Sequence, residues 1–96
     1  MIDNPYLPIK TEVLDVIEES PTIKTFRLKP ETPLYFKAGQ FMEMSILGKG
    51  EAPFTPSSSP YEKDKLEITI MKAGRITDMI HNLKKGDVVG LRGPYG

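Results

Sequence analysis

Residues 52–60, with the sequence APFTPSSSP, hold three prolines within nine positions and lie between two runs typical of β-strands. Proline has a fixed φ and no backbone N–H, so it removes a hydrogen bond from the ladder of any central strand. The segment therefore cannot be an ordinary central strand. It is expected to be stiff, with hydroxyl side chains and backbone N–H groups left over from strand pairing.

The same segment has a chemical character that a ligand could use. Phe54 offers a flat apolar ring and Thr55 beside it offers a hydroxyl, a combination that suits a planar heteroaromatic ligand. Serine and proline are also common in polar surface loops. From these residues alone, a ligand-facing segment and a plain surface loop both remain open.

Short runs of alternating apolar or β-branched residues predict strands on both sides of this segment. They lie at residues 10–19, 22–29, 41–47, 65–72 and 87–91. The first run allows a helical or a strand period, but its β-branched residues favour a strand. Ser20 and Pro21 end this run and predict a turn before the next one, so the first two runs are expected to pair antiparallel.

The connections between these strands are less regular. Residues 1–9 are expected to form an irregular leader, and residues 92–96 a turn. In the connection at residues 30–40, Tyr35 and Phe36 are expected to form a small core under the loop.

One helix is predicted after the strand at residues 65–72. Apolar residues recur there at helical spacing, at positions Ile76, Met79, Ile80 and Leu83. Thr77 is the expected N-cap, and residues 84–86 supply a C-terminal stop. His81, the single histidine, is expected on the outer face of this helix as a surface residue.

These elements amount to about six short strands and one short helix, without strand–helix–strand alternation. The expected fold class is therefore all-β: a six-stranded antiparallel Greek-key barrel with one short α-helix. We expect this barrel to form one domain over residues 10–96.

Composition excludes several classes of function. Thirteen Lys and Arg balance thirteen Asp and Glu, which disfavours binding to nucleic acid or to an anionic membrane. The absence of cysteine excludes disulfides and cysteine-held iron–sulfur clusters within these residues. No spacing predicts a metal site or a catalytic pair, so we expect neither. With no secretory signal and no membrane-length apolar stretch, a cytoplasmic protein is expected.

A second candidate binding segment opens the predicted helix. Gly74, Arg75, Ile76 and Thr77 combine a glycine turn, a basic side chain and free N–H groups, as a phosphate site requires. Asp78 works against this interpretation, because a carboxylate in the first turn occupies the same positive field. An ordinary capped helix is the alternative.

Taken in order, these pieces resemble the flavin-binding barrel of the ferredoxin–NADP reductase-like family. The resemblance runs from Val13 to Gly96 and includes the turn AGQF at residues 38–41 and the closing run KKGDVVGLRGPYG. It is closest to the flavoprotein subunits of cytoplasmic hydrogenases, sulfur reductases and dihydroorotate dehydrogenase electron-transfer modules. The resemblance implies FAD as cofactor, with FMN as second choice.

The family's first motif is Arg, any residue, Tyr, then Ser or Thr, and Ala52, Phe54 and Thr55 occupy those positions here. The resemblance implies that Phe54 stacks on the flavin ring and that Thr55 places its hydroxyl near the flavin N5. Ser57 and Ser58 are further candidates in the same segment. Ala52 departs from the motif, because the family arginine pairs with a cofactor phosphate.

Losing such a charge-assisted contact costs about 1.5–3 kcal/mol, or roughly one to two decades of affinity. Lys72 and Arg75 are the candidates to compensate for the missing arginine, and the sequence leaves open whether either does so. The second motif of the family, a phosphate-binding glycine turn, matches residues 74–77.

Residues 93–96 resemble the hinge after which family members continue into a nicotinamide-binding domain. The expectation is a flavin domain that is not active alone and that meets NAD(P)H only through that second domain. Its expected role is to seat the flavin between NAD(P)H and the redox centre of a partner subunit. The alternative is a non-catalytic binding or scaffold barrel that has lost its cofactor; a small nucleic-acid-binding barrel is the weakest interpretation.

Overall fold

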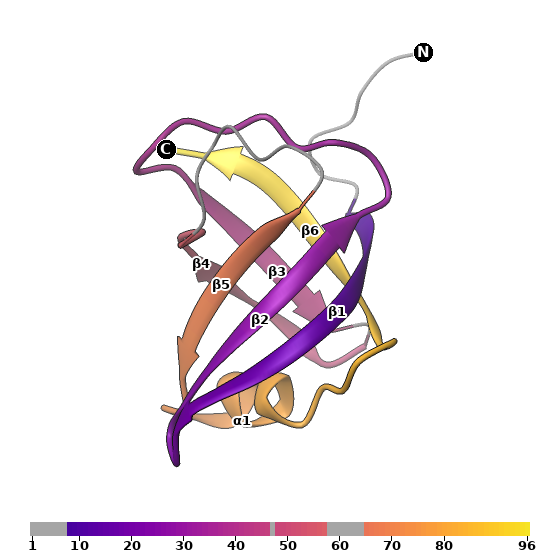
Figure 1. Cartoon of the computed structure of the whole chain (residues 1–96). Helices are drawn as coiled ribbons and strands as arrows, with labels where there is room; N and C mark the ends of the chain where they lie inside the picture. The colour runs from indigo at the N-terminus through magenta and orange to yellow at the C-terminus, as the bar shows by residue number, and fades with distance from the viewer. Residues whose placement is uncertain (1–7, 47, 58–64) are drawn as a thin grey trace.

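The computed structural model of the chain describes residues 8–46, 48–57 and 65–96 (Figure 1). Residues 1–7 of the expected leader, and Ser58 among the candidate site residues, lie outside the described residues. The strands are β1 (Ile9–Ser20), β2 (Ile23–Pro30), β3 (Phe41–Ile46), β4 (Gly50–Phe54), β5 (Leu66–Met71) and β6 (Val88–Tyr95). The single helix of the described residues, α1 (Arg75–His81), lies between β5 and β6 in the chain.

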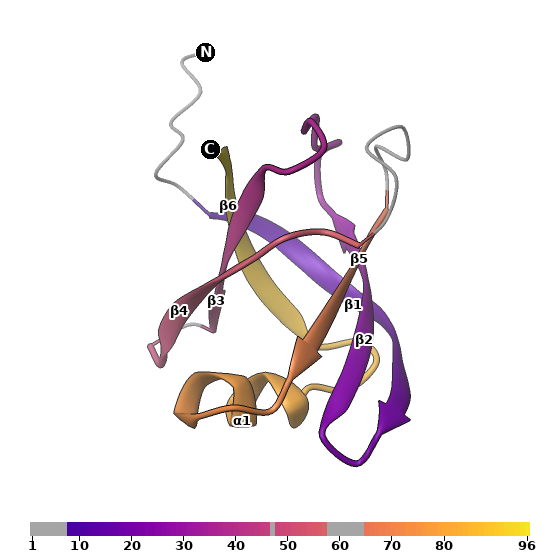
Figure 2. The same cartoon turned by 90° about the vertical axis from the view of Figure 1, so that its left-hand side faces the viewer.

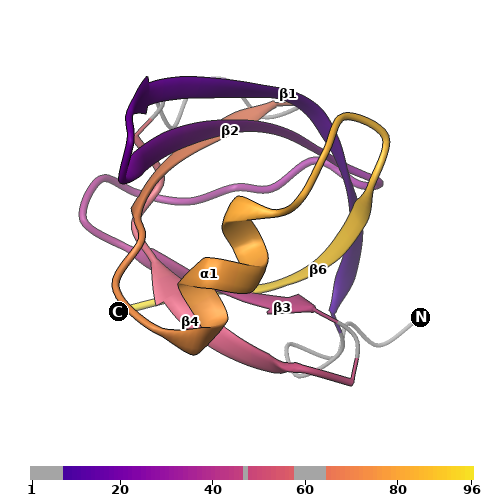
Figure 3. The ribbon, with the colours of Figure 1, turned by 90° about the horizontal axis from the view of Figure 1, so that it is seen from below.

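All six strands form one sheet in the order β4-β3-β6-β1-β2-β5, and each neighbouring pair is antiparallel. The sheet curls until its edge strands β4 and β5 lie on the same side of the molecule (Figures 1 and 2). These two strands do not pair with each other, so the barrel is open between them. The helix α1 lies across one end of the barrel (Figure 3). The predicted antiparallel barrel with one short helix is confirmed.

The core follows from the two-residue period of the strands. In β5, Leu66, Ile68 and Ile70 are buried while the residues between them are not, and Met42 and Met44 do the same on β3. Ile80 of α1 closes the end of this core. The buried apolar residues form one cluster, made of Val13, Phe26, Leu28, Leu34, Phe36, Met42, Met44, Leu66, Ile68, Ile70, Ile80, Val89 and Leu91.

The proline-rich segment begins as an edge strand. Residues 50–54 pair with β3, with Met44 opposite Ala52 and Met42 opposite Phe54. An edge strand has a partner on one side only, which is where a residue such as Pro53 is tolerated. The expectation that this segment is not a central strand is thus confirmed, although no strand at residues 50–54 was predicted from the local pattern.

The expected turn at residues 92–96 is wrong. Strand β6 continues to Tyr95, and Tyr95 lies opposite Phe41 on β3. The register of the β3–β6 pairing shifts between Phe41 and Glu43 of β3, which lets the two strands stay paired past Gly93 and Pro94 of β6. The local sequence pattern had indicated that the strand ends before these two residues. The rings of Phe41 and Tyr95 pack with centroids 5.6 Å apart.

Two expectations about α1 are also wrong. His81 is 6% exposed instead of lying on the surface, and its Nε2 lies 2.8 Å from the carbonyl oxygen of Ile70 at the end of β5. The N-cap is Gly74, not Thr77, which lies inside the first turn. The helix α1 thus begins three residues earlier than the cap assignment assumed, and His81 is its last residue.

The prediction that Tyr35 and Phe36 form a small core in the connection between β2 and β3 is correct for Phe36 only. Phe36 is buried as expected, together with Leu34, but Tyr35 is 64% exposed. No helix formed by the described residues has both the length and the apolar character needed to cross a membrane.

Candidate functional site

Phe54 and Thr55 meet at a hollow beside the open edge of the barrel. The hollow has a volume of about 490 Å³ and is lined by Phe41, Glu43, Pro53, Phe54 and Thr55. Phe54 is half-buried and packs against the core, so its backbone is held in place by β3 pairing and its side chain by the barrel. Thr55 is exposed, and its hydroxyl has no hydrogen-bond partner among the described residues. An apolar ring and a free hydroxyl thus share one opening.

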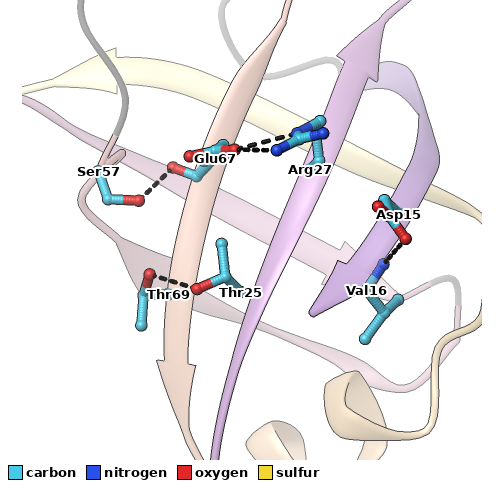
Figure 4. Close-up of polar contacts among 7 residues, drawn as sticks. All are labelled: Asp15, Val16, Thr25, Arg27, Ser57, Glu67 and Thr69. Atoms are coloured by element: carbon cyan, nitrogen blue, oxygen red, sulfur yellow. Dashed lines mark hydrogen bonds and ion pairs between the residues drawn. The ribbon is translucent and has the colours of Figure 1, made fainter. Parts of the chain in front are cut away.

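Both hydrogen-bond donors of Ser57 are used within the protein. Its backbone N–H donates to the carbonyl oxygen of Glu67 on β5 at 2.7 Å. Its hydroxyl donates to the same oxygen at 3.0 Å (Figure 4). Its hydroxyl oxygen can still accept a hydrogen bond, but neither of its donors is free for a ligand.

The segment at residues 74–77 is fixed by bonds within its own turn. The Thr77 hydroxyl accepts from Ala73 N at 2.8 Å and donates to the Gly74 carbonyl at 3.0 Å. The first intrahelical bond runs from Asp78 N to the same carbonyl. The backbone N–H groups of Arg75, Ile76 and Thr77 precede that bond and have no place in the helical ladder.

Two cations lie near this turn. Lys72 and Arg75 are both exposed, and neither side chain forms an ion pair with any of the described residues. The Lys72 backbone N–H donates to the Thr22 carbonyl at 2.7 Å, so the chain at this point is tied to the β1–β2 turn. The Asp78 carboxylate in the first turn of α1 is the opposing charge, as the sequence indicated.

The first turn of α1 lies against the beginning of β4. A Cβ atom placed on Gly50 would lie 2.7 Å from Ile76 Cδ1, so glycine permits the close approach of the two elements. Ile76 is partly buried against the core. The structure therefore brings residues 74–77 close to the strand that carries Ala52 and Phe54, although the two segments are separate in the sequence.

A further cation in the barrel is not available to replace the arginine missing at Ala52. Arg92 on β6 binds the Glu51 carboxylate on β4 through Nε at 2.8 Å and through Nη2. These hydrogen bonds, followed by its attraction to Glu51, raise the pKa of Arg92 above its ordinary value despite partial desolvation. Glu43, on the strand between them, adds a weaker attraction.

Sequence reasoning missed Phe41 and Glu43 as lining residues of the hollow. The strand period was the available signal, because Met42 and Met44 face the core and their neighbours must face outward. Among the described residues there is no group of three or more His, Cys, Asp or Glu residues placed to hold a metal ion.

Residues 10–96 match the family described as oxidoreductase FAD-binding domain. The chain is 44% identical over 99 residues to sulfhydrogenase 1 subunit gamma of Pyrococcus furiosus, a match that covers 98% of this chain and 34% of that protein. It is 44% identical over 89 residues to a probable dihydroorotate dehydrogenase B (NAD(+)) electron transfer subunit of Methanocella arvoryzae, covering 93% and 32%. The chain thus spans about a third of the length of these curated relatives.

Solved structures agree on the architecture. The cytochrome b5 reductase domain of Ulva prolifera nitrate reductase superposes with a TM-score of 0.85 over 97% of this chain and 43% of that one, at 18% identity. A ferredoxin NADP+ reductase from Neisseria gonorrhoeae, solved with bound FAD and NADP, superposes with a TM-score of 0.77 over 86% of this chain and 35% of that one, at 26% identity.

Proposed function

Since this chain belongs to the family of oxidoreductase FAD-binding domains, we propose that it seats FAD between a nicotinamide donor and the redox centre of a partner protein. The family and its FAD-bound structural relative support FAD over FMN. They also support a flavin domain over a scaffold barrel that has lost its cofactor.

The observation that carries the proposal for the ring is the hollow beside Phe54 and Thr55. Its apolar wall suits the flat face of the isoalloxazine, and the unpartnered Thr55 hydroxyl suits a nitrogen or oxygen at the edge of that ring. When bound, FAD supplies the chemistry that accepts a hydride and passes electrons on. Phe54 would hold the ring by stacking on it, and Thr55 would orient it through its hydroxyl.

For the phosphates we propose residues 74–77 and the neighbouring cations. Ala52 carries no charge, and Arg92 is bound to Glu51, so neither can neutralise a pyrophosphate. Lys72 and Arg75 are exposed, uncommitted and next to the turn that matches the family's phosphate-binding motif. We assign them the charge compensation that the family arginine provides elsewhere.

The electron donor and acceptor are proposals at the level of the whole protein. One relative is named an electron transfer subunit, and the other a subunit of a sulfhydrogenase. By analogy, this domain works within a multi-subunit enzyme and meets NAD(P)H through a separate nicotinamide-binding domain. Because flavin and nicotinamide must be held face to face for hydride transfer, the domain is not expected to be active alone. A cytoplasmic location stays a prediction.

The direct test is a fluorescence titration of FAD with purified protein. The chain has no tryptophan, so the signal comes from the flavin. We expect saturable quenching in the native protein and weaker binding in Phe54→Ala, by about tenfold if one stacking contact of about 1–1.5 kcal/mol is lost. The exposed aromatic Tyr35, outside the hollow, provides the control variant Tyr35→Ala.

The phosphate assignment is tested with the same assay and two ligands. Lys72→Ala and Arg75→Ala should weaken FAD binding and leave riboflavin, which has no phosphate, unchanged. Equal losses for both ligands would contradict the assignment of the cations to phosphate. Absence of FAD binding by the native domain at high micromolar concentration would contradict the proposed function itself.

A further inference from the structure

We propose that Ser57 is a positioning residue of the flavin site, which ties the segment after β4 to β5 and thereby holds Thr55 at the hollow. The inference rests on the proposed function, because it assigns the ring to Phe54 and Thr55. It gives Ser57 a role through its neighbours, not through contact with the cofactor.

The first observation is where the two donors of Ser57 point. The backbone N–H and the hydroxyl both donate to one acceptor, the carbonyl oxygen of Glu67, at 2.7 Å and 3.0 Å. Glu67 lies on β5, whose other side pairs with β2. The two bonds therefore cross the opening between the edge strands β4 and β5, which do not pair with each other. We call these two hydrogen bonds from Ser57 to Glu67 the clasp.

The second observation is that the acceptor is itself held. The Glu67 carboxylate binds Arg27, directly opposite on β2, through Nε and Nη2 at 3.0 Å each (Figure 4). Two residues further along, the hydroxyls of Thr25 and Thr69 are 2.9 Å apart and join the same two strands. With side chains 43% and 35% exposed, the Arg27–Glu67 pair contributes little stability of its own. Its consequence is geometric: β5 cannot shift along β2 without breaking both side-chain links.

The third observation is the position of Thr55 between two fixed points. Phe54 is the last residue of β4 and is held by pairing with β3, whereas Ser57 is held by β5. Thr55 and Pro56 span the interval, and the fixed φ of proline leaves this short bridge few alternative conformations. Loosening Ser57 frees one end of the bridge, so the Thr55 hydroxyl no longer has a fixed place against the ring.

The proposal predicts a selective effect on the ring end of the cofactor. Residues 74–77 are held by the Thr77 hydroxyl and by the Lys72 N–H bond to Thr22, and none of these bonds involves Ser57. Ser57→Ala should therefore weaken riboflavin and FAD by a similar factor, about threefold to tenfold for one lost hydrogen bond. Binding of ADP, measured by competition with FAD, should stay within about twofold.

Two variants make the comparison specific. Ser57→Thr keeps the hydroxyl and should restore flavin binding. Asp15→Ala removes an exposed side chain that accepts a backbone hydrogen bond from Val16 on β1, outside the proposed site, and should leave every ligand unaffected. Equal weakening of FAD and ADP by Ser57→Ala would indicate a general loss of structure, and no weakening at all would show that the clasp does not position the ring. Either result overturns the proposal.

A measurement without cofactor separates this proposal from the proposed function. Hydrogen–deuterium exchange of the native domain should show a protected Ser57 amide, and exchange should accelerate in Ser57→Ala as the second bond to Glu67 is lost. An unprotected Ser57 amide in the native protein refutes the clasp even if FAD binds. A protected amide in a protein that binds no flavin refutes the proposed function and leaves Ser57 without this role.

Discussion

Gly50→Ala should destabilise the domain where α1 touches β4. Gly50 has a φ of +140°, and a Cβ atom there would lie 2.7 Å from Ile76 Cδ1 and 3.7 Å from Ile76 Cγ1. A methyl group would press the edge strand and the first turn of the helix apart. Gly48 offers a matched control, because it also has a positive φ, of +75°, but no atom lies within 4 Å of its Cβ position.

Two effects contribute to the cost of Gly50→Ala. Carbon atoms normally pack about 3.5–4.0 Å apart, so Ile76 Cδ1 must move by roughly 1 Å. Overpacking costs about 1–3 kcal/mol, and the low end applies because Cδ1 is the tip of a side chain that can rotate. A residue with a side chain at this φ adds about 1–3 kcal/mol of backbone strain. The strain is therefore expected to be the larger part, in a total of about 2–4 kcal/mol.

A double-mutant cycle with Ile76→Val isolates the contact. Valine has no Cδ1 atom, so it removes the 2.7 Å clash and leaves the ordinary 3.7 Å approach. In urea unfolding followed by circular dichroism, Ile76→Val alone should cost about 0.5–1.5 kcal/mol. The loss of unfolding free energy in the double variant should be about 1 kcal/mol smaller than the sum of the losses in the two single variants. Additive effects, or a Gly50→Ala cost no larger than that of Gly48→Ala, would refute the reasoning.

Two further predictions concern the anchoring of α1. His81→Leu should lower the free energy of unfolding by about 1–3 kcal/mol, because it leaves the buried Ile70 carbonyl without its hydrogen-bond donor. His81→Gln can still donate and should lower it less. Thermal unfolding of the two variants provides the comparison. Thr77→Ala should cost about 1 kcal/mol and increase exchange of the Ala73 amide, while Thr77→Ser, which keeps the hydroxyl, should leave that amide protected. Unchanged Ala73 exchange in Thr77→Ala would contradict this assignment.

Much of the fold could be predicted because it depends on local periodicity. The alternation of Leu66, Ile68 and Ile70 identifies both the strand and its inward face, and all three residues are buried. The edge strand at residues 50–54 escaped prediction because Pro53 is a breaker in most contexts, and only its place at the edge of the sheet makes it acceptable. His81 was misplaced for a similar reason: its partner is a carbonyl at the end of another element, 11 residues earlier.

The candidate site divides in the same way. Phe54 and Thr55 are adjacent in the sequence, so their joint character was visible before any fold was known. The hydrogen bonds of Ser57 could not be predicted in this way, because their acceptor, the carbonyl of Glu67, lies 10 residues away. The Glu67 side chain is in turn bound by Arg27, which is 40 residues from it in the sequence. Hydrogen bonds of this kind depend on strand register, and the sequence pattern of a single strand does not specify the register of its partner.

The position of β6 has a consequence for biosynthesis. This strand is the last of the described elements to be made, yet it lies between β3 and β1 in the middle of the sheet. Before residues 88–95 leave the ribosome, the nascent chain can form β5-β2-β1 and β4-β3, but no strand pairing links these two parts of the sheet. The open edges of β1 and β3 then resemble unprotected sheet edges, which are sites of aggregation. We therefore expect the sheet that carries the proposed cofactor site to be completed only when β6 pairs with both β3 and β1.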